Sequence, residues 1–555
     1  MDDMKIKLLK KQIDNTLRFI KPLLPLANCH MVEFITENCW ENFLPTAVAQ
    51  EVDKFGTKEA INEFWNVRGN ILLKNFPTTT IQRLPNNGGQ TNLVNFIEEA
   101  DRHCLKVDGV LCLTVDQLKE NFKGMGATEV DSLKIEEFMS NKKSHEVEVL
   151  SSIVAMLASS AKVNYTIELG GGRGFLATTL NMVYNMPVLN IDCAESNAKG
   201  AEKRNKKMKK KWPGLVKKAE SSKTESIPEN TSPDDLANES VNKKVVSRNN
   251  SKENQFSEKV DREKAISDGI SDLSIKGHGK DSKTNVLYKH VTDFVSLETD
   301  LMKHVKNEFQ DHPTEINLCL TGLHTCGDLG STTVKLFNRS SESSILCAVP
   351  CCYHLLTEQI FENPLSESKE SFQNQNTGFP MSEHLRDFII GRNARMLASQ
   401  SIERFSDSQQ LPSDSLFYRA LLQVILKKNY EGNPAPEGKL KGVAEKCSDF
   451  IEYRKLAFIK LKVDQDKINL SDEELNQFED AYNIHKDKLN LFYLLKMCLA
   501  PVIESIVLLD RLMYLAENGF VGEVGDAYLV KMFDPVVSPR CHALVAFRKK
   551  YVSKE

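Results

Sequence analysis

The sequence predicts an α/β protein with a mostly parallel sheet, on two observations. From about residue 139, short β-rich runs alternate with helical segments, and each run is followed by a polar or glycine-rich turn. Such alternation is typical of βαβ units, whose strands lie parallel. Near the C-terminus two further β-rich runs follow each other directly, which predicts an antiparallel hairpin at the edge of the same sheet.

Before the sheet, residues 1 to 135 carry apolar residues at helical spacing, as in Leu93, Ile97 and Ala100, so we expect a mainly helical N-terminal region. Residues 136–555 then form the sheet domain. Its five expected parallel strands are Tyr165–Leu169, Val188–Ile191, Val286–Tyr288, Ile316–Thr321 and Ile345–Val349. An amphipathic helix at Ala500–Asn518 precedes the expected hairpin of Ala527–Phe533 and His542–Arg548.

Two segments interrupt this domain. Residues 200–284 are polar and poor in aromatics, so we expect a disordered insertion, and residues 430–490 are expected to form a helical excursion. A second polar loop is expected near 366–377. The basic run Lys203–Lys211 fits a nuclear localisation signal, a segment that binds RNA phosphates, or a solvated helix end.

The composition argues against several classes of protein. The 555 residues include 72 Lys and Arg against 76 Asp and Glu, so no net charge draws the whole chain to nucleic acid or anionic lipid. The 13 cysteines are odd in number and form no framework, which favours a reducing compartment. The most apolar window, Leu489–Leu509, is interrupted by Lys496, Pro501 and Glu504, which a membrane span tolerates poorly. We expect an intracellular protein, cytoplasmic or nuclear, with no secretory signal and no membrane partner.

The most informative residues form a glycine turn after the first expected strand. Gly170, Gly171, Gly172 and Gly174 follow Glu168 in an E-x-G-x-G-x-G pattern. Glycines let the backbone bend tightly and approach a ligand closely. A glycine turn between a strand and a helix also occurs without any ligand, so the turn alone does not assign a function.

This pattern resembles the first motif of the class I methyltransferases, which use S-adenosylmethionine and have a Rossmann-like fold. The resemblance implies that the loop lies under the methionine moiety and that Glu168 orients its amino group. It also implies that Asp192, about 20 residues after the first glycine, takes both ribose hydroxyls. Asp293 is then expected at the adenine edge, with Phe294 as an apolar wall.

Residues at two later strand ends indicate which family of methyltransferases the sequence resembles. The segments Leu323–Leu329, reading L-H-T-C-G-D-L, and Val349–His354, reading V-P-C-C-Y-H, resemble the methyltransferase-like protein 25 family. Further matching segments are Lys142–Glu146, Gly378–Ser382, Leu499–Ser505 and Leu508–Arg511. The similarity to acceptor-stem tRNA 2′-O-methyltransferases is more distant, and their zinc-finger spacing is absent from the sequence.

The strand ends also supply candidate catalytic groups. Methyl transfer to a hydroxyl or amide acceptor needs a base, and His354 and His324 are the candidates that titrate near neutrality. Asp328 is expected to orient one of them. The alternative for each histidine is a structural role with satisfied hydrogen bonds.

The cysteines at these strand ends leave three interpretations open. Pro350-Cys351-Cys352 is similar to the nucleophile segment of cytosine-5 methyltransferases, but buried structural cysteines are commoner. A zinc site made of Cys326, Cys351, Cys352 and His354 is conceivable. Because no C-x-x-C pair supports it, the sequence predicts no metal site.

The sequence thus predicts an S-adenosylmethionine-dependent methyltransferase that acts on a macromolecule, RNA or protein. The alternative is a methyltransferase fold kept as a catalytically silent scaffold or cofactor-sensing module. The sequence does not choose the methyl acceptor or the oligomeric state.

Overall fold

The computed structural model describes residues 2–75, 91–128, 139–224, 287–358, 378–430, 442–463 and 470–552, with single residues 130, 440 and 468. The chain divides into two units, and residues Met1–Leu215 together with Leu287–Glu555 form the unit that contains the sheet. The other unit, Val216–Val286, lies outside the described residues except for the end of one helix.

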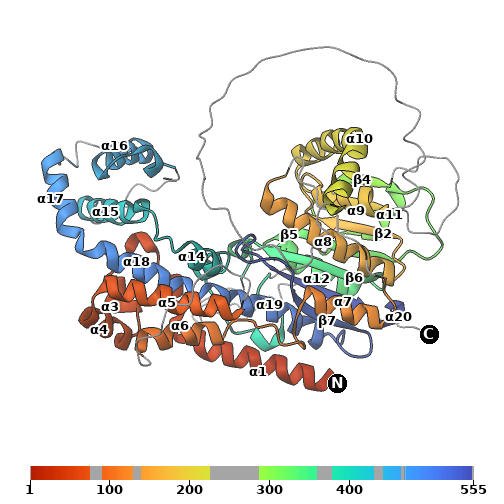
Figure 1. Cartoon of the computed structure of the whole chain (residues 1–555), viewed down its shortest axis with the longest axis horizontal. Coiled ribbons are helices and arrows are strands. Elements are labelled where there is room, and N and C mark those ends of the chain that lie inside the picture. The colour runs from red at the N-terminus through yellow and green to blue at the C-terminus, as the bar shows by residue number, and fades with distance from the viewer. Residues whose placement is uncertain are drawn as a thin grey trace, which may run out of the picture. The chain divides into compact units, whose positions relative to one another are not determined.

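The core of the first unit is one eight-stranded sheet in the order β1-β7-β8-β6-β5-β2-β3-β4 (Figure 1). Its strands are β1 Cys112–Thr114, β2 Tyr165–Leu169, β3 Val188–Asp192, β4 Tyr288–Thr292, β5 Leu318–Cys326, β6 Ser343–Cys351, β7 Gly525–Lys531 and β8 His542–Arg548. Only β8 runs antiparallel to its neighbours, β6 and β7. This arrangement confirms the predicted Rossmann-like sheet with a C-terminal antiparallel hairpin.

Helices cover both faces of this sheet. Alternate residues of β5 point to opposite sides, so that Leu318 and Leu320 pack into one hydrophobic cluster and Cys319 packs into the other. The helices α11 Leu301–Glu308, α12 Asp328–Arg339 and α19 Ala500–Glu517 contribute to the first cluster. The helices α7 Val115–Gly124, α8 Asn141–Ser160 and α9 Phe175–Tyr184 contribute to the second. Each face is therefore buried, as a parallel sheet requires.

The N-terminal region is helical as far as the sheet. Its helices are α1 Asp2–Ile20, α2 Leu24–Asn28, α3 Cys39–Phe43, α4 Thr46–Phe55, α5 Thr57–Asn75 and α6 Asn92–Arg102. It then adds β1, which pairs in parallel with β7. A strand of three residues is too short to show a periodic pattern, so β1 was not predicted from the sequence. Helix α1 is joined to β7 by Lys5, whose Nζ lies 2.6 Å from Asp526 Oδ1.

The segment predicted as a disordered insertion begins as a helix. Helix α10 spans Glu195–Thr224, whereas the insertion was expected from residue 200. Lysine and glutamate have high helix propensity, and pairs such as Glu202 with Lys206, 2.6 Å apart, support a helix despite the polar composition. Buried Ala201 and Met208 fix its first half against the unit. Residues 225–286 lie outside the described residues.

The third expected strand is displaced along the chain. It was predicted at Val286–Tyr288, and β4 instead begins at Tyr288 and ends at Thr292. Because β4 is an edge strand, Lys289, His290 and Val291 are only half buried, so the apolar signal there is weak.

Another set of helices forms its own cluster. The helices α15 Asp414–Asn429, α16 Phe450–Leu461 and α17 Asp472–Tyr482 share a hydrophobic core around Phe450 and Tyr453. Two of them lie within the helical excursion expected at 430–490. The short helices α13 Arg392–Leu397, α14 Ile402–Ser408 and α20 Lys549–Val552 complete the described helices together with α18 Ile484–Met497. The polar loop expected at 366–377 lies outside the described residues.

The most apolar part of the chain is the stretch Ile484–Glu517, formed by α18 and α19. It is the one described stretch long and apolar enough to cross a membrane, and 89% of its most apolar window is buried inside the protein. Ile503, Ile506 and Leu508 are fully buried in α19. This stretch is therefore the central helical core of the unit.

Removing core volume from α19 should destabilise the whole unit. We expect Leu508→Ala to lower the free energy of unfolding by about 2–5 kcal/mol, because a cavity remains where the side chain was. Leu456→Ala, at a position 38% exposed on α16, is the control and should cost less than about 1 kcal/mol. Urea unfolding measures both, and equal losses in the two variants would contradict this account of the core.

Candidate functional site

The glycine loop joins β2 to α9 through left-handed backbone angles. The angle φ is +69° at Gly170, +55° at Gly172 and +64° at Gly174. Residues with a Cβ adopt such angles only at a cost. At Gly171 a Cβ would collide with the side-chain amide of Asn190. The shape of the loop therefore requires glycine at each of these positions.

Glu168 is buried beside this loop and is hydrogen-bonded to the helix that follows it. It is 2% exposed, and its Oε2 accepts a hydrogen bond from the N–H of Ala177 at 2.9 Å. Because Ala177 lies in the first turn of α9, the carboxyl group is placed at the positive end of that helix. Burial raises the pKa of Glu168 to about 8, and the Ala177 hydrogen bond opposes the rise.

Asp192 ends β3 and connects this strand to the glycine loop. Its Oδ2 accepts the N–H of Gly172 at 2.9 Å. Its Oδ1 accepts the N–H of Ala194 at 3.0 Å and the side-chain amide of Asn197 at 2.9 Å. A carboxylate has about four acceptor positions, so about one remains for a ligand.

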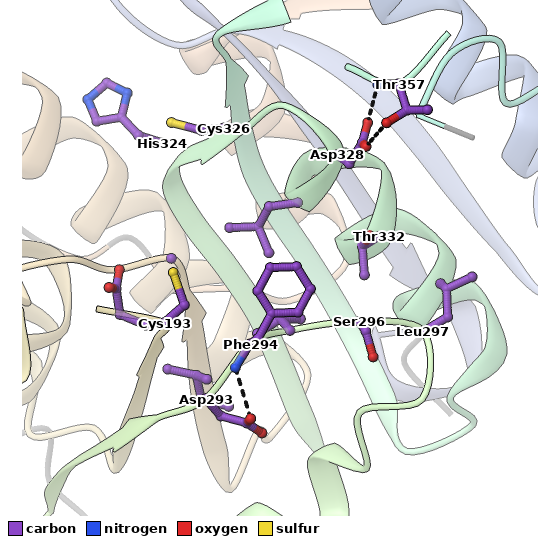
Figure 2. A pocket seen from close by; sticks show the side chains of 15 residues that line it. Cys193, Asp293, Phe294, Ser296, Leu297, His324, Cys326, Asp328, Thr332 and Thr357 are labelled. Carbon is purple, nitrogen blue, oxygen red and sulfur yellow. Dashed lines mark hydrogen bonds between the residues drawn. The ribbon is translucent and has the colours of Figure 1, made fainter. Parts of the chain in front are cut away.

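A cavity of about 590 Å³ lies where the parallel strands β2 to β5 end (Figure 2). It is lined by Gly170, Ile191, Asp192, Cys193, Asp293, Phe294, Val295, Ser296, Leu297, His324, Cys326, Asp328, Leu329, Thr332 and Thr357. The predicted site residues among them are Gly170, Asp192, Asp293, His324 and Asp328. The others, namely Glu168, Gly171, Gly172, Gly174 and His354, are not among the described lining residues. Ligands of open α/β sheets bind at this edge.

Asp293 and Phe294 form one wall of the cavity directly after β4. Asp293 Oδ2 lies 2.9 Å from His304 Nε2, and its Oδ1 accepts the N–H of Phe294 at 2.8 Å. The Phe294 side chain is 75% exposed, although large apolar groups are usually buried. Figure 2 shows its ring in the middle of the lining residues. An exposed ring beside a cavity offers an apolar face to a planar ligand.

His324 is held by a carboxylate that the sequence did not reveal. Strand β5 continues to Cys326, so His324 lies in the strand and not in the turn after it. Its Nε2 lies 3.2 Å from Oε2 of Glu146, which is fully buried on α8. Glu146 Oε1 accepts the hydroxyl of Ser538 at 2.7 Å, and Lys143 Nζ lies 3.2 Å from its Oε2.

These neighbours decide the charge of Glu146. Burial alone would raise its pKa, but the hydrogen bond and charge of His324, the charge of Lys143 and the hydrogen bond from Ser538 outweigh burial. The pKa of Glu146 therefore lies well below its usual range, and the side chain is a carboxylate at neutral pH. The segment Lys142–Glu146, noted in the sequence for its family resemblance, was the one signal that could have identified this partner.

The other two predicted catalytic residues are arranged differently from expectation. Asp328 begins α12 and accepts both the N–H, at 2.7 Å, and the hydroxyl of Thr357, so its described partner is not a histidine (Figure 2). His354 lies in the 3-10 turn η3, Tyr353–Leu355, and its buried Nδ1 has no hydrogen-bond partner within the described ranges. Of the predicted bases, only His324 lines the cavity.

Three cysteines meet beside His324. Cys326 Sγ lies 3.1 Å from Cys351 Sγ, which lies 3.7 Å from Cys352 Sγ. The hydrogen bond from Cys351 is the main influence that lowers the pKa of Cys352 to about 5, while hydrogen bonds to both neighbours raise the pKa of Cys351. Cys352 has a φ of +52°, an angle uncommon for a residue with a side chain.

Comparisons with known proteins found a matching domain family and similar full-length proteins. A family model described as a methyltransferase domain matches residues 142–359. The chain is 30% identical to the mouse (Mus musculus) protein "Probable methyltransferase-like protein 25", over 98% of this chain and 97% of that one. It is 31% identical to the human (Homo sapiens) protein of the same name, over 98% and 97%. No solved structure matches the chain significantly.

The raised pKa of Glu168 predicts a pH-dependent stability. The folded state holds this proton up to about pH 8, whereas the unfolded chain releases it near pH 4.3. The contribution to wild-type stability is therefore lost as the pH rises through this window, by on the order of a few kcal/mol. Glu168→Gln removes the titration, so its stability relative to wild type should rise between pH 5 and 8.

Urea unfolding at both pH values measures this difference, with Glu120→Gln as a matched loss of an exposed carboxyl. If Glu168→Gln and wild type have the same pH dependence, the buried carboxyl does not titrate in this range.

Proposed function

The chain belongs to the methyltransferase-like protein 25 family, and we propose that it transfers a methyl group from S-adenosylmethionine to a macromolecule, RNA or protein. The observation that carries this proposal is the convergence of Gly170, Asp192 and Asp293 on one cavity. These three residues follow or end three different strands, and the family resemblance assigns them to methionine, ribose and adenine. A glycine turn without a ligand would not require the two acids at the same cavity.

The cavity has the properties that this cofactor requires. Its volume of about 590 Å³ lies within the range of about 300–1,000 Å³ usual for small-ligand sites. Ile191, Val295 and Leu297 give it apolar walls. Three acceptor positions of Asp192 are occupied by hydrogen bonds from Gly172, Ala194 and Asn197. About one position is left, which supports a hydrogen bond to one ribose hydroxyl.

The cofactor supplies a methyl group activated on a sulfonium, so the protein has to orient the acceptor and remove its proton. His324 is the lining residue suited to that task. Its Nε2 is engaged by Glu146, and its Nδ1 has no hydrogen bond within the described residues, which leaves Nδ1 to accept a proton. The Glu146 carboxylate fixes the ring and stabilises the imidazolium as it forms.

The charges in the cavity favour a protein acceptor. Asp192, Asp293 and Asp328 line it, and no lysine or arginine is found among its described lining residues. A neutral or cationic side chain enters such a site at lower electrostatic cost than a phosphate backbone does.

A second hollow favours RNA as the acceptor. It measures about 280 Å³ and is lined by Arg173, Lys203, Arg204 and Lys207, with no acidic residue among its described lining. Arg173 lies in the glycine loop, so this basic hollow is next to the proposed cofactor site. Basic groups at such a position bind phosphates.

Loss of the Asp192 carboxylate should weaken cofactor binding. We expect Asp192→Ala to bind S-adenosylhomocysteine on the order of 10²-fold more weakly, because a charged hydrogen bond and the support of Gly172 are lost together. Asp311→Ala, at an exposed loop position, is the control. Isothermal titration calorimetry measures both, and equal affinities would overturn the ribose assignment.

Loss of His324 should affect turnover more than binding. We expect His324→Asn to reduce methyl transfer by about 10²–10⁴-fold with near-normal cofactor affinity. The assay uses labelled S-adenosylmethionine with extract from cells that lack the enzyme, and His312→Asn, an exposed position, is the control. Unchanged transfer in His324→Asn would assign the base elsewhere, and a wild type that labels neither RNA nor protein would favour the scaffold alternative.

Charge reversal on α10 should show whether the methyl acceptor is RNA or protein. For an RNA acceptor, Lys203→Glu with Lys207→Glu should weaken binding to cellular RNA at least about tenfold and reduce its salt dependence. Lys54→Glu with Lys58→Glu gives the same charge change at exposed positions elsewhere. If both double variants bind RNA equally, this hollow does not bind RNA and the protein acceptor is favoured.

A further inference from the structure

The three cysteines at the ends of β5 and β6 are closer together than an ordinary core requires. Cys326, Cys351 and Cys352 each offer a sulfur, and all three sulfurs lie within 4.8 Å of one another. Cys351 is buried, Cys352 is half-buried, and Cys326 is exposed and lines the cavity. Inert structural thiols are usually buried in apolar surroundings, which describes only one of the three.

The spacing of the sulfurs fits a metal ion. Zinc binds thiolates at about 2.3 Å in a tetrahedral arrangement, which places neighbouring sulfurs about 3.8 Å apart. Cys351 and Cys352 already stand 3.7 Å apart. The 3.1 Å separation of Cys326 from Cys351 reaches that spacing by a small side-chain rotation.

The backbone and the surrounding charges support the same assignment. The positive φ of Cys352, +52°, is what allows two consecutive residues to direct their sulfurs to one point. Such angles at non-glycine residues gather at functional sites. Zinc with three thiolates carries one excess negative charge. Arg540 lies close enough to Cys352 for its positive charge to act on the Cys352 thiol and offset that excess.

We propose that Cys326, Cys351 and Cys352 bind one zinc ion at the edge of the cavity. Three thiolates leave the fourth position of a tetrahedral ion open, as in catalytic zinc sites. Soft thiolate ligands select zinc over magnesium, calcium or manganese. The site is independent of the proposed methyl transfer, because metal is bound without cofactor or acceptor. The sequence predicted no metal here, since the ligands come from two strands and lack C-x-x-C spacing.

The first test is the metal content of the full-length chain, purified under reducing conditions without chelators. Mass spectrometry of the metals should find about one zinc per wild-type chain. Cys326→Ser, Cys351→Ser and Cys352→Ser should each lose most of it. Cys193→Ser is the matched control, because Cys193 is also exposed and lines the same cavity without joining the cluster. Wild type without zinc, or with copper or iron in its place, would overturn the proposal.

The second test needs no variant and so does not depend on folding of the serine variants. Wild-type protein stripped with a chelator is compared with the same protein reloaded with zinc, and thiol alkylation is mapped by peptide mass spectrometry. Zinc should slow alkylation of Cys326 and Cys352 at least about tenfold and leave Cys193 unchanged. Equal alkylation rates with and without zinc, or a Cys326–Cys351 disulfide in place of reactive thiols, would refute the metal site.

Discussion

A hydrogen bond from the Gly172 amide to the Asp192 carboxylate joins the glycine loop to the next strand of the sheet. The donor is accessible only because Gly172 adopts a left-handed φ of +55°. The acceptor is correctly placed only because Asp192 ends β3, the parallel neighbour of β2. The shape of the loop and the position of the proposed ribose ligand are thus fixed by the same contact, and the rest of the cavity is arranged around it.

Two buried carboxyl groups stabilise the site, and at neutral pH one of them is protonated while the other is ionised. Glu168 lies under the loop, and burial raises its pKa to about 8 although the Ala177 hydrogen bond and the charges of Lys143 and Arg204 oppose the rise. Glu146 is equally buried but faces His324, Lys143 and Ser538, and these partners lower its pKa despite burial. The first residue shapes the glycine loop, and the second supplies a fixed negative charge behind the proposed base. Burial prevails at Glu168, whereas the neighbouring donors and charges outweigh burial at Glu146.

The sequence predicted those parts of the site whose positions depend on residues close by in the chain. The glycine loop, Asp192 and Asp293 are local in this sense, because a parallel strand and the turn after it form one short motif. Glu146 could not be found that way, since it meets His324 across 178 positions and Ser538 across 392. The cysteine cluster joins two strands, because Cys326 of β5 pairs with Cys351 of β6, 25 positions further along the chain. The polar start of α10 was interpreted as disorder because its buried face has few apolar residues, Ala201 and Met208, and exposed charge pairs support the rest of the helix.

The central claim is that the cavity beyond β2 to β5 binds S-adenosylmethionine, and photochemical labelling tests it directly. Radiolabelled S-adenosylmethionine is crosslinked to the full-length protein with ultraviolet light, and the labelled peptides are identified by mass spectrometry. The account predicts label on peptides that contain Cys193 or Phe294, which line the cavity, and its loss in excess S-adenosylhomocysteine. Label confined to other peptides, or label that S-adenosylhomocysteine does not displace, would contradict it.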